Sequence, residues 1–419
     1  MSSPAAERSR RYEIPSPAQQ RWPGLASPPP AGTRAAIARA IFGRAVSRLK
    51  LRATLPDGRV LGHGGARSPV MRIHNAKEFF ARLGADGKVG FGESYMTGSW
   101  TADDLAGVLT VFAEQITTLV PPILQSLRRF YDQRRPTEEE NTLAGAKTNI
   151  QRHYDLSNDL FALFLDESMT YSAAWYGPGE TLEQAQVRKI DGILDMARVG
   201  PDTHLLEIGT GWGSLAIRAA VERGARVTSL TLSEEQKALA EERIAAAGVA
   251  DRVRVVIHDY REAQGRYDAI ASVEMIEAVG ERYLPAYFRA LDRLLKPGGW
   301  IGLQAITMPH HRMVASRNSY TWIHKYIFPG GLLPSFRLIE QQVRSHTALR
   351  VIERRDLSSD YAQTLQEWRT RFLAQTDKVL SLGFDQTFIK MWEFYLAYCE
   401  AGFRSRYLRD FQLGLRRDH

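Results

Sequence analysis

The spacing of apolar and polar residues divides the chain into three parts. Residues 1–33 have no regular apolar spacing and contain many Pro, Ser, Ala and Arg, which predicts a flexible tail. Residues 34–140 combine short strand-like and helix-like stretches, which predicts a small α+β domain. The polar stretch "RRPTEEENTLAG" marks a boundary, and residues 141–419 predict a second, larger domain.

Local signals predict individual elements in the first domain. Residues 51–62 predict two strands joined by a turn at Asp57-Gly58. Residues 75–84 predict a short helix that ends at Gly84. Residues 101–116 predict a longer helix with Thr101 as its N-cap and acidic residues in its first turn.

Beyond residue 200, strand and helix patterns alternate. Strands are predicted at 204–209, 225–233, 252–259, 267–275 and 300–307, and helices at 212–224, 233–248 and 284–299. This order predicts an α/β fold with a doubly wound, mostly parallel sheet and right-handed crossovers. Ligands of such sheets bind beyond the carboxyl ends of the strands, which is where Glu274 and Glu277 fall.

Composition excludes several classes of protein. The 419 residues carry a formal net charge of +8, but no nucleic-acid-binding motif accompanies it, so we expect no nucleic acid partner. The single Cys399 excludes an intramolecular disulfide, and the adjacent His310 and His311 lack a third ligand, so we expect no metal site. Neither a membrane-spanning apolar run nor a signal core is present, so we expect a cytoplasmic protein.

Residues 34–52 predict a basic helix. Apolar residues repeat every four positions along one side, at Ile37, Ile41, Ala45 and Leu49. Arginines surround them, and no acidic residue occurs between Glu13 and Asp57. Such a helix suits peripheral binding to an anionic membrane, where each basic residue contributes ~1 kcal/mol. The alternative is a helix that packs on its own domain and leaves its basic side in water.

The first strand-to-helix turn, "LLEIGTGWGS", is a candidate cofactor motif. Gly209, Gly211 and Gly213 follow Glu207, and glycines here let a ligand approach the backbone. Dinucleotide sites usually have G-x-G-x-x-G spacing and an acid at the end of the next strand. Here the third glycine comes one residue early and the next strand ends in "LTLSEEQ". This combination favours S-adenosylmethionine over a nicotinamide cofactor.

Several further stretches resemble a known family. "NIQRHYDLSNDLFALFLDESMTYSAAWY", "LLEIGTGWGS", "LTLSEEQ", "SVEMIEAVG", "KYIFPGGLLPS" and "DYAQTLQEW" occur in the order found in cyclopropane-fatty-acid synthases and mycolic-acid methyltransferases. "VGFGESYMTGSW", "QAITMPHHRM" and "MWEFYLAYCEAGFRS" extend the likeness to actinobacterial methyltransferases of the tuberculostearic-acid pathway. The resemblance implies a Rossmann-like class I methyltransferase that converts an oleoyl chain of a phospholipid into a 10-methylene-stearoyl chain.

The resemblance also implies which residues hold S-adenosylmethionine. Tyr171 and Ser172 match a pair that closes over the cofactor, and Gly209 and Gly211 match the glycines under its methionine part. The hydroxyl and amide near the ribose match Thr231 and Gln236, and the adenine contacts match Asp259, Tyr260 and Arg261.

Methylation of an alkene requires electrostatics rather than a base for activation, because an alkene has no proton to lose before attack. A carboxylate about 4 Å from the carbocation, at an effective dielectric of about 20, stabilises it by about 4 kcal/mol. The resemblance implies that Glu277 faces this cation and that Tyr361 lies in the same pocket, whereas Glu274 is expected to be structural.

Two positions depart from the family pattern. The family holds a bicarbonate base with Cys, Glu, His and Tyr, but Ala173 replaces the Cys and Gln304 replaces the His. The residue after the acid, often His, is Ala278. Bicarbonate binding of the family type is therefore in question. We hypothesise that the altered pocket, with Gln304 as one of its residues, favours a hydride shift and loss of a proton to give a methylene group.

The acyl chain requires an apolar channel. We expect a lid at about 305–404, with a channel lined by Trp322, Tyr326, Phe328 and Leu332. Reduction of the methylene group needs hydride chemistry, so the resemblance implies a separate flavin-dependent reductase as a partner.

Other functions remain open at this stage. A cyclopropane synthase with an atypical base uses the same cofactor and substrate class. A small-molecule N- or O-methyltransferase has the same fold but little need for the basic helix. A lipid-binding module without enzymatic activity has no need for the cofactor turn.

Overall fold

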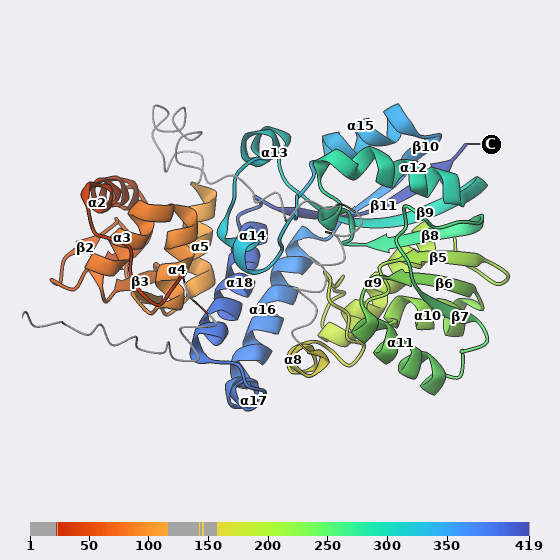
Figure 1. Cartoon of the computed structure of the whole chain (residues 1–419), viewed down its shortest axis with the longest axis horizontal. Helices are drawn as coiled ribbons and strands as arrows, with labels where there is room; N and C mark the ends of the chain where they lie inside the picture. Colours follow the sequence, from red (N-terminus) through yellow and green to blue (C-terminus); the bar gives the residue numbers. More distant parts are fainter. Residues whose placement is uncertain (1–21, 23, 116–141, 143–144, 146–156, 419) are drawn as a thin grey trace, which may run out of the picture.

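The larger part of the chain is built on a seven-stranded sheet. The structure is a computed structural model that describes residues 22, 24–115, 142, 145 and 157–418 (Figure 1). The strands lie in the order β10-β11-β9-β8-β5-β6-β7. Their bounds are β5 His204–Ile208, β6 Arg226–Thr231, β7 Val253–Ile257, β8 Tyr267–Val273, β9 Leu295–Thr307, β10 Leu349–Asp356 and β11 Arg409–Arg417.

The predicted parallel sheet is confirmed. Strands β9, β8, β5, β6 and β7 pair in parallel, each with its neighbour. Strand β11 pairs antiparallel with both β9 and β10. The sequence pattern does not predict β10 and β11, because charged residues interrupt the apolar alternation of "LRVIERRD" and "RDFQLGLRR".

Helices cover both faces of the sheet. α9 (Leu182–Met196), α10 (Ser214–Arg223) and α11 (Glu234–Ala246) lie on one face, and α12 (Leu284–Leu294) and α15 (Phe336–His346) on the other (Figure 1). Side chains of β5 alternate between these layers. Leu205 packs in the cluster under α9–α11, whereas Leu206 and Ile208 pack in the cluster under α12 and α15.

A group of helices lies beside the sheet. It contains α16 (Ser358–Ala374), α17 (Thr376–Ser381) and α18 (Gln386–Arg404), together with the short α8 (Asn158–Ala162), α13 (His310–Ser316) and α14 (Trp322–Tyr326). The segment at about 305–404, where a lid is expected, contains α13 to α18 and β10. Helix α15 covers one face of the sheet, and β10 is the strand at one edge of it. The role of this segment as a substrate lid stays a prediction.

The N-terminal unit is a four-stranded sheet with helices packed on it. Its strands lie in the order β2-β1-β3-β4. The elements are α2 Thr33–Val46, β1 Arg52–Thr54, β2 Val60–Leu61, β3 Val70–Ile73, α3 Ala76–Asp86, α4 Lys88–Met96, β4 Trp100–Ala102 and α5 Leu105–Glu114. The predicted strand pair around Asp57-Gly58 is confirmed by the antiparallel pairing of β1 with β2.

Two helix ends in this unit differ from the predictions. Helix α3 continues past Gly84 to Asp86. Thr101 is not an N-cap, because it belongs to β4; Asp104 caps α5 instead by accepting a hydrogen bond from the backbone N–H of Gly107. The acidic residues therefore precede the helix rather than forming its first turn.

Helix α2 buries a different face from the predicted one. Ala38, Phe42 and Val46 are its buried residues, whereas Ile37 is 54% exposed. The ring of Phe42 packs against Phe79, with ring centroids 5.1 Å apart. Phe80 and Phe112 also pack on this ring, so an aromatic cluster sets the rotation of the helix.

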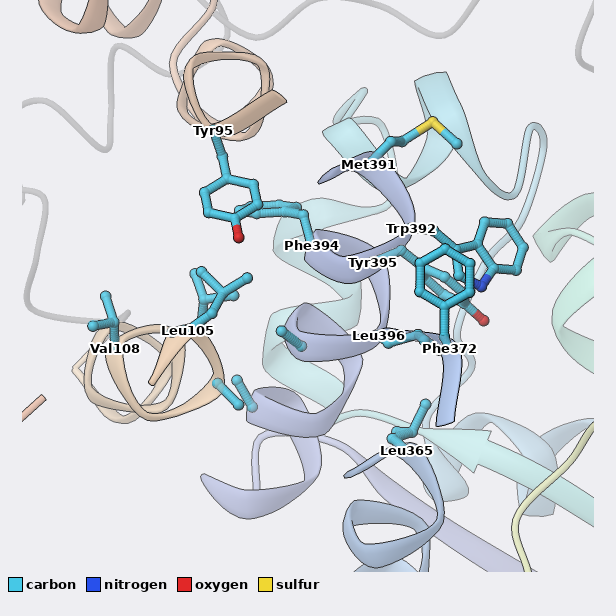
Figure 2. Close-up of a cluster of buried hydrophobic side chains, with 14 of the residues drawn as sticks. Tyr95, Leu105, Val108, Leu365, Phe372, Met391, Trp392, Phe394, Tyr395 and Leu396 are labelled. Carbon is cyan, nitrogen blue, oxygen red and sulfur yellow. The ribbon is translucent and has the colours of Figure 1, made fainter. Parts of the chain in front are cut away.

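Helix α18 joins the two units into one apolar core. Figure 2 shows Phe394 on the side of α18 that faces Tyr95 and Leu105 of the N-terminal unit, and Trp392 near Phe372. The ring centroids of Tyr95 and Phe394 are 5.5 Å apart. One cluster of buried residues contains members from both units.

Part of the predicted tail is bound to the folded body. Trp22 Nε1 donates to Asp385 Oδ2 over 2.8 Å, and the carbonyl of Leu25 accepts from Arg82 Nη2 over 2.9 Å. The rest of the predicted tail (1–21 and 23) and the domain boundary expected at 140 lie outside the described residues. Over the described ranges, no helix combines the length and the apolar character needed to cross a bilayer.

Candidate functional site

The carboxyl ends of β5, β6, β7 and β8 surround a cavity at one edge of the sheet. The lining contains all ten residues expected at the cofactor: Tyr171, Ser172, Glu207, Gly209, Gly211, Thr231, Gln236, Asp259, Tyr260 and Arg261. The structure thus brings these residues together from separate stretches of the chain.

The glycine turn after β5 forms the floor of the cavity. Gly209 and Gly211 have φ angles of 98° and 53°, in a region that glycine adopts without the clash a side chain causes. The N–H of Gly209 donates to the carbonyl of Leu230 over 2.9 Å, which ties the turn to β6. A Cβ atom added at Gly211 would meet no atom within 4 Å, so a ligand has room to approach the backbone there.

Glu207 provides a carboxyl group at the end of β5. Its Oε2 accepts a hydrogen bond of 2.5 Å from Ser229 Oγ on β6. Burial raises the pKa of Glu207 to about 8, and the hydrogen bond from Ser229 opposes the rise. A cationic ligand group beside Glu207 would favour its ionised form.

Side chains at the end of β6 are fixed by the start of α11. Thr231 Oγ1 donates to Gln236 Oε1 over 3.1 Å. Ser233 is the N-cap of α11 and accepts from the backbone N–H of Gln236 over 3.2 Å. This cap holds the predicted hydroxyl and amide at the cavity wall.

The end of β7 provides a rigid polar wall. Asp259 Oδ1 accepts from the backbone N–H of Arg261 over 2.9 Å and from its Nε over 2.8 Å. The Tyr260 ring is buried against Tyr287, with ring centroids 5.3 Å apart. Asp259 and Arg261 therefore hold each other in place, and Tyr287 holds the ring of Tyr260.

The Tyr171-Ser172 pair connects the cavity to the neighbouring helices. The hydroxyls of Tyr171 and Tyr395 lie 2.6 Å apart. Lys189 Nζ donates to Ser172 Oγ over 2.5 Å. Sequence reasoning missed Lys189, which lines the cavity although its side chain is 2% exposed. Burial lowers the pKa of Lys189 to about 8, and the carboxylates of Glu274 and other acids oppose this.

Glu274, expected to be structural, lines the cavity and gathers the residues expected to be catalytic. Its Oε2 accepts from the Tyr361 hydroxyl over 2.7 Å. Its Oε1 accepts from Gln304 Nε2 over 2.9 Å and from the backbone N–H of Ala173 over 2.8 Å. Tyr361 and Gln304 therefore converge on Glu274.

Glu277 lies one turn further on, in the 3₁₀ helix η3 (Ile276–Ala278). Its Oε1 accepts from the backbone N–H of Ile306 over 2.5 Å, and its Oε2 is buried with no hydrogen-bond partner among the residues that the structure describes. Burial and the nearby Glu274 raise the pKa of Glu277 to about 8. The structure does not place Glu277 beside Tyr361 or Gln304, and its role toward a carbocation stays a prediction.

Two polar residues of β11 were missed by sequence reasoning. Gln412 pairs across the strands with Gln304, and Asp410 Oδ2 accepts from Gln304 Nε2 over 2.9 Å. Both belong to "RDFQLGLRR", where polar residues at alternating positions are the signal that would have identified a buried polar strand face.

The four residues expected in the acyl channel separate into two pairs, and none of them lines the cavity. Trp322 and Tyr326 pack on the N-terminal unit, where the Tyr326 hydroxyl donates to Glu93 Oε1 over 2.8 Å. Phe328 and Leu332 lie closer to the site. The Phe328 ring is 5.8 Å from that of Tyr395, and the N–H of Leu332 donates to the carbonyl of Glu277 over 2.8 Å.

The cavity fits S-adenosylmethionine. A carboxyl group at Glu207 suits an ammonium group, and the polar ends of β6 and β7 suit ribose and adenine. The open space over Gly211 allows close approach to the backbone.

Comparisons with known proteins identify the family of the chain. Residues 142–413 match the family model described as mycolic acid cyclopropane synthetase. The chain is 50% identical over 409 residues to the tuberculostearic acid methyltransferase UfaA1 of Mycobacterium tuberculosis, an alignment that covers 95% of this chain and 96% of the relative. It is 34% identical over 362 residues to the cyclopropane-fatty-acyl-phospholipid synthase of Escherichia coli, covering 83% of this chain and 88% of the relative.

A solved structure extends the comparison to the fold. The mycolic acid cyclopropane synthase CmaA1, complexed with SAH and CTAB, is similar with a TM-score of 0.61 and 30% identity, covering 65% of this chain and 98% of that one. Residues 142–413, which the family model matches, contain the whole seven-stranded sheet except the end of β11. The chain therefore belongs to the mycolic acid cyclopropane synthetase family and is an S-adenosylmethionine-dependent methyltransferase.

Proposed function

We propose that the enzyme methylates the cis double bond of an oleoyl chain in a phospholipid and forms a 10-methylene-stearoyl chain. The observation that carries this proposal is the anchored carboxylate of Glu274 in the wall of the methyl-donor cavity. A heteroatom substrate needs a base before attack, whereas an alkene needs a fixed negative charge after it. The extensive identity with a named tuberculostearic acid methyltransferase supports the same substrate class.

Different residues of the site bind the methyl donor and exclude water. When bound, S-adenosylmethionine supplies an electrophilic methyl group. Glu207, Gly211 and the Thr231–Gln236 pair hold the donor side of the cavity. Aromatic rings near Glu274 exclude water, because the Tyr361 ring stacks on Phe403 at 4.5 Å between centroids. Exclusion of water prevents its addition to a carbocation, which would yield an alcohol.

The fate of the carbocation distinguishes the two products in this family. Closure of a ring gives a cyclopropane, whereas a hydride shift followed by loss of a proton gives a methylene group. Cyclopropane formation is the alternative function, and the relatives named as cyclopropane synthases favour it. Ala173 and Gln304, where the resemblance implies Cys and His, favour the methylene product.

Carbon NMR of the product lipid tests this function. The enzyme is incubated with oleoyl phospholipid vesicles and S-adenosylmethionine carrying carbon-13 in its methyl group. A vinylic methylene signal is expected. A cyclopropyl signal would instead establish the ring-forming alternative, and absence of label in the lipid would exclude both.

We propose that the basic surface of α2 binds the inner face of the cytoplasmic membrane. Arg34, Ile37 and Arg44 of α2 are exposed, as is Arg48 just beyond the helix, while the opposite side of α2 packs on the N-terminal unit. Exposed basic residues with an apolar residue among them suit an anionic lipid surface.

Sedimentation with anionic vesicles tests membrane binding. The double substitution Arg34→Glu and Arg44→Glu is expected to reduce the bound fraction at least threefold, and added salt should reduce binding of the unchanged enzyme. The matched control is Arg252→Glu with Arg254→Glu at β7, an exposed pair at the other end of the molecule (Figure 1). Equal losses for both pairs would show that net charge, rather than the α2 surface, controls binding.

A separate flavin-dependent reductase is the proposed partner that consumes the product. Converting a methylene group to a methyl branch requires addition of a hydride and a proton, which methyl transfer does not provide. The purified enzyme is therefore expected to stop at the methylene lipid. A methyl-branched product from the purified enzyme alone would exclude the need for this partner.

A further inference from the structure

The carboxylate of Glu274 accepts hydrogen bonds from three donors. The donors are the Tyr361 hydroxyl, the Gln304 amide and the backbone N–H of Ala173, at 2.7, 2.9 and 2.8 Å. An ionised carboxylate accepts from all three. Burial raises the pKa of Glu274, and the hydrogen bonds from Tyr361, Ala173 and Gln304 and the charge of Lys189 oppose this rise. These contacts therefore stabilise the ionised form of Glu274.

The orientation of the Gln304 amide is fixed by a chain of hydrogen bonds. Arg355 Nη1 donates to Gln412 Oε1 over 2.7 Å, and Gln412 Nε2 donates to Gln304 Oε1 over 3.2 Å. Because a guanidinium group only donates, each amide in the chain has one allowed orientation. Gln304 therefore presents its NH₂ group to Glu274 and is unable to remove a proton from a substrate.

The backbone of Glu274 is held in an uncommon conformation. Its φ angle is 49°, in the left-handed region that side chains other than glycine rarely adopt. Its N–H donates to the carbonyl of Gln304 over 2.9 Å, which extends the pairing of β8 with β9 by one residue. Such strain persists where the surrounding structure imposes it, and it is common at functional sites.

Glu277 is less suited to accept a proton. One of its oxygens accepts from the Ile306 backbone, and the other is buried and has no partner within the described part of the chain. Burial and the negative charge of Glu274 both raise the pKa of Glu277. Glu277 also does not line the cavity, whereas Glu274 does.

We propose that Glu274 is the catalytic base of this enzyme and takes the place of an external anion. This inference rests on the proposed function. The resemblance to the family implies a bicarbonate held by residues at positions 173, 277, 304 and 361. Three of these positions instead contact the Glu274 carboxylate.

The reaction then balances with the groups present. The double bond attacks the donor methyl group, so a carbon–carbon bond forms as the sulfur–methyl bond breaks. A hydride moves from the methylated carbon to the neighbouring cationic carbon. The new methyl group loses a proton to Glu274, and the electron pair of that C–H bond becomes the second bond of the methylene C=CH₂ group. Water that enters after product release accepts the proton from Glu274.

Matched amide variants test which acid is the base. Glu274→Gln is expected to lower the rate of methyl transfer at least 100-fold, in line with the usual contribution of a general base. Its affinity for S-adenosylhomocysteine, measured by calorimetry, should stay within about threefold of the unchanged enzyme. Glu277→Gln should lose less activity than Glu274→Gln. A larger loss in Glu277→Gln would overturn the assignment.

Glu274→Gly provides a test that does not depend on loss of activity. Glycine adopts a φ of 49° without strain, so the backbone is expected to keep its conformation. Removal of the side chain leaves a carboxylate-sized space beside Ala173, Gln304 and Tyr361. Added formate or bicarbonate should restore at least a tenth of the activity to Glu274→Gly but not to Glu274→Gln, whose amide fills the space.

Two further outcomes separate the inference from the proposed function. The unchanged enzyme should keep its rate in carbonate-free buffer; a dependence on bicarbonate would contradict the inference. A folded Glu274→Gly variant that binds S-adenosylhomocysteine but is not rescued would also contradict it. If the unchanged enzyme forms a cyclopropane, the proposed product is wrong, but the rescue test still stands because ring closure also releases a proton.

Discussion

The hydroxyl of Tyr361 lies 2.7 Å from Glu274 Oε2, although the two residues are 87 positions apart in the chain. Helix α16 carries the tyrosine, and the end of β8 carries the acid. This contact places Tyr361 beside Glu274 rather than beside Glu277, and it identifies the tyrosine as a donor that stabilises a negative charge.

Tyr361→Phe should therefore slow methyl transfer without weakening cofactor binding. A hydrogen bond to a charged group contributes about 1.5–3 kcal/mol, which corresponds to roughly 10- to 100-fold in rate. The matched control is Tyr95→Phe, which removes a hydroxyl that donates to Glu393 over 2.7 Å in the N-terminal interface. That variant should lose stability rather than turnover per folded molecule; equal kcat values for the two variants would argue against a role for Tyr361.

Gly209→Ala and Gly211→Ala should separate folding from ligand binding. A Cβ at Gly209 would lie 2.9 Å from Met275 Cγ, and the φ of 98° disfavours alanine. Gly209→Ala should lower the Tm of the protein without ligand, whereas Gly211→Ala should lower it less and still weaken S-adenosylhomocysteine binding at least tenfold. Thermal melts and calorimetry check this. Unchanged affinity in Gly211→Ala would contradict the proposed approach of the cofactor to this backbone.

Gly92→Ala and Gly43→Ala should change stability in opposite directions. A Cβ at Gly92 would lie 2.4 Å from Cδ1 of the Trp322 ring, which links the N-terminal unit to α14. We expect a destabilisation of roughly 1–3 kcal/mol from this overpacking. At Gly43, inside α2, a Cβ would meet nothing within 4 Å, so alanine should stabilise by about 0.5–1 kcal/mol. Denaturant unfolding of both variants measures the difference.

Glu277→Gln should change how stability depends on pH. Because the pKa of Glu277 is raised to about 8, the folded protein keeps a proton that the unfolded chain loses above about pH 4.5. The unfolded state then binds fewer protons, so the free energy of unfolding falls as pH rises from 5 to 7.5, by at most about 1.4 kcal/mol per pH unit for this group.

Glu277→Gln should reduce that slope, while Glu207, with a pKa also near 8, keeps its own contribution. The Glu274 and Asp410 carboxylates and the Tyr287 hydroxyl interact with Glu277, so their titration is part of the measured curve. Chemical unfolding at several pH values provides the slopes. An identical slope for the variant would mean that Glu277 is ionised in the folded protein.

The sequence by itself determined the parallel sheet and the cofactor turn. Strand and helix alternation encodes crossovers of a single hand, so the doubly wound sheet follows from local patterns. Gly209 and Gly211 stand where the backbone has left-handed φ angles. Glycine adopts such angles more easily than other residues, so the residue type alone indicates the turn. Most of the cofactor residues lie at the carboxyl ends of β5, β6 and β7, so their convergence was predictable. Tyr171 and Ser172 follow no strand, and only the resemblance to the family implied their place at the cofactor.

Only the tertiary structure decided which acid lines the cavity. Glu274 and Glu277 both follow β8, and the pattern of residues does not distinguish them. The difference arises from the left-handed backbone at Glu274 and from donors that α16 and β9 bring to it, with Gln412 of β11 fixing the amide. These partners are distant in sequence, so their contacts exist only after the chain has folded, and no local propensity encodes them.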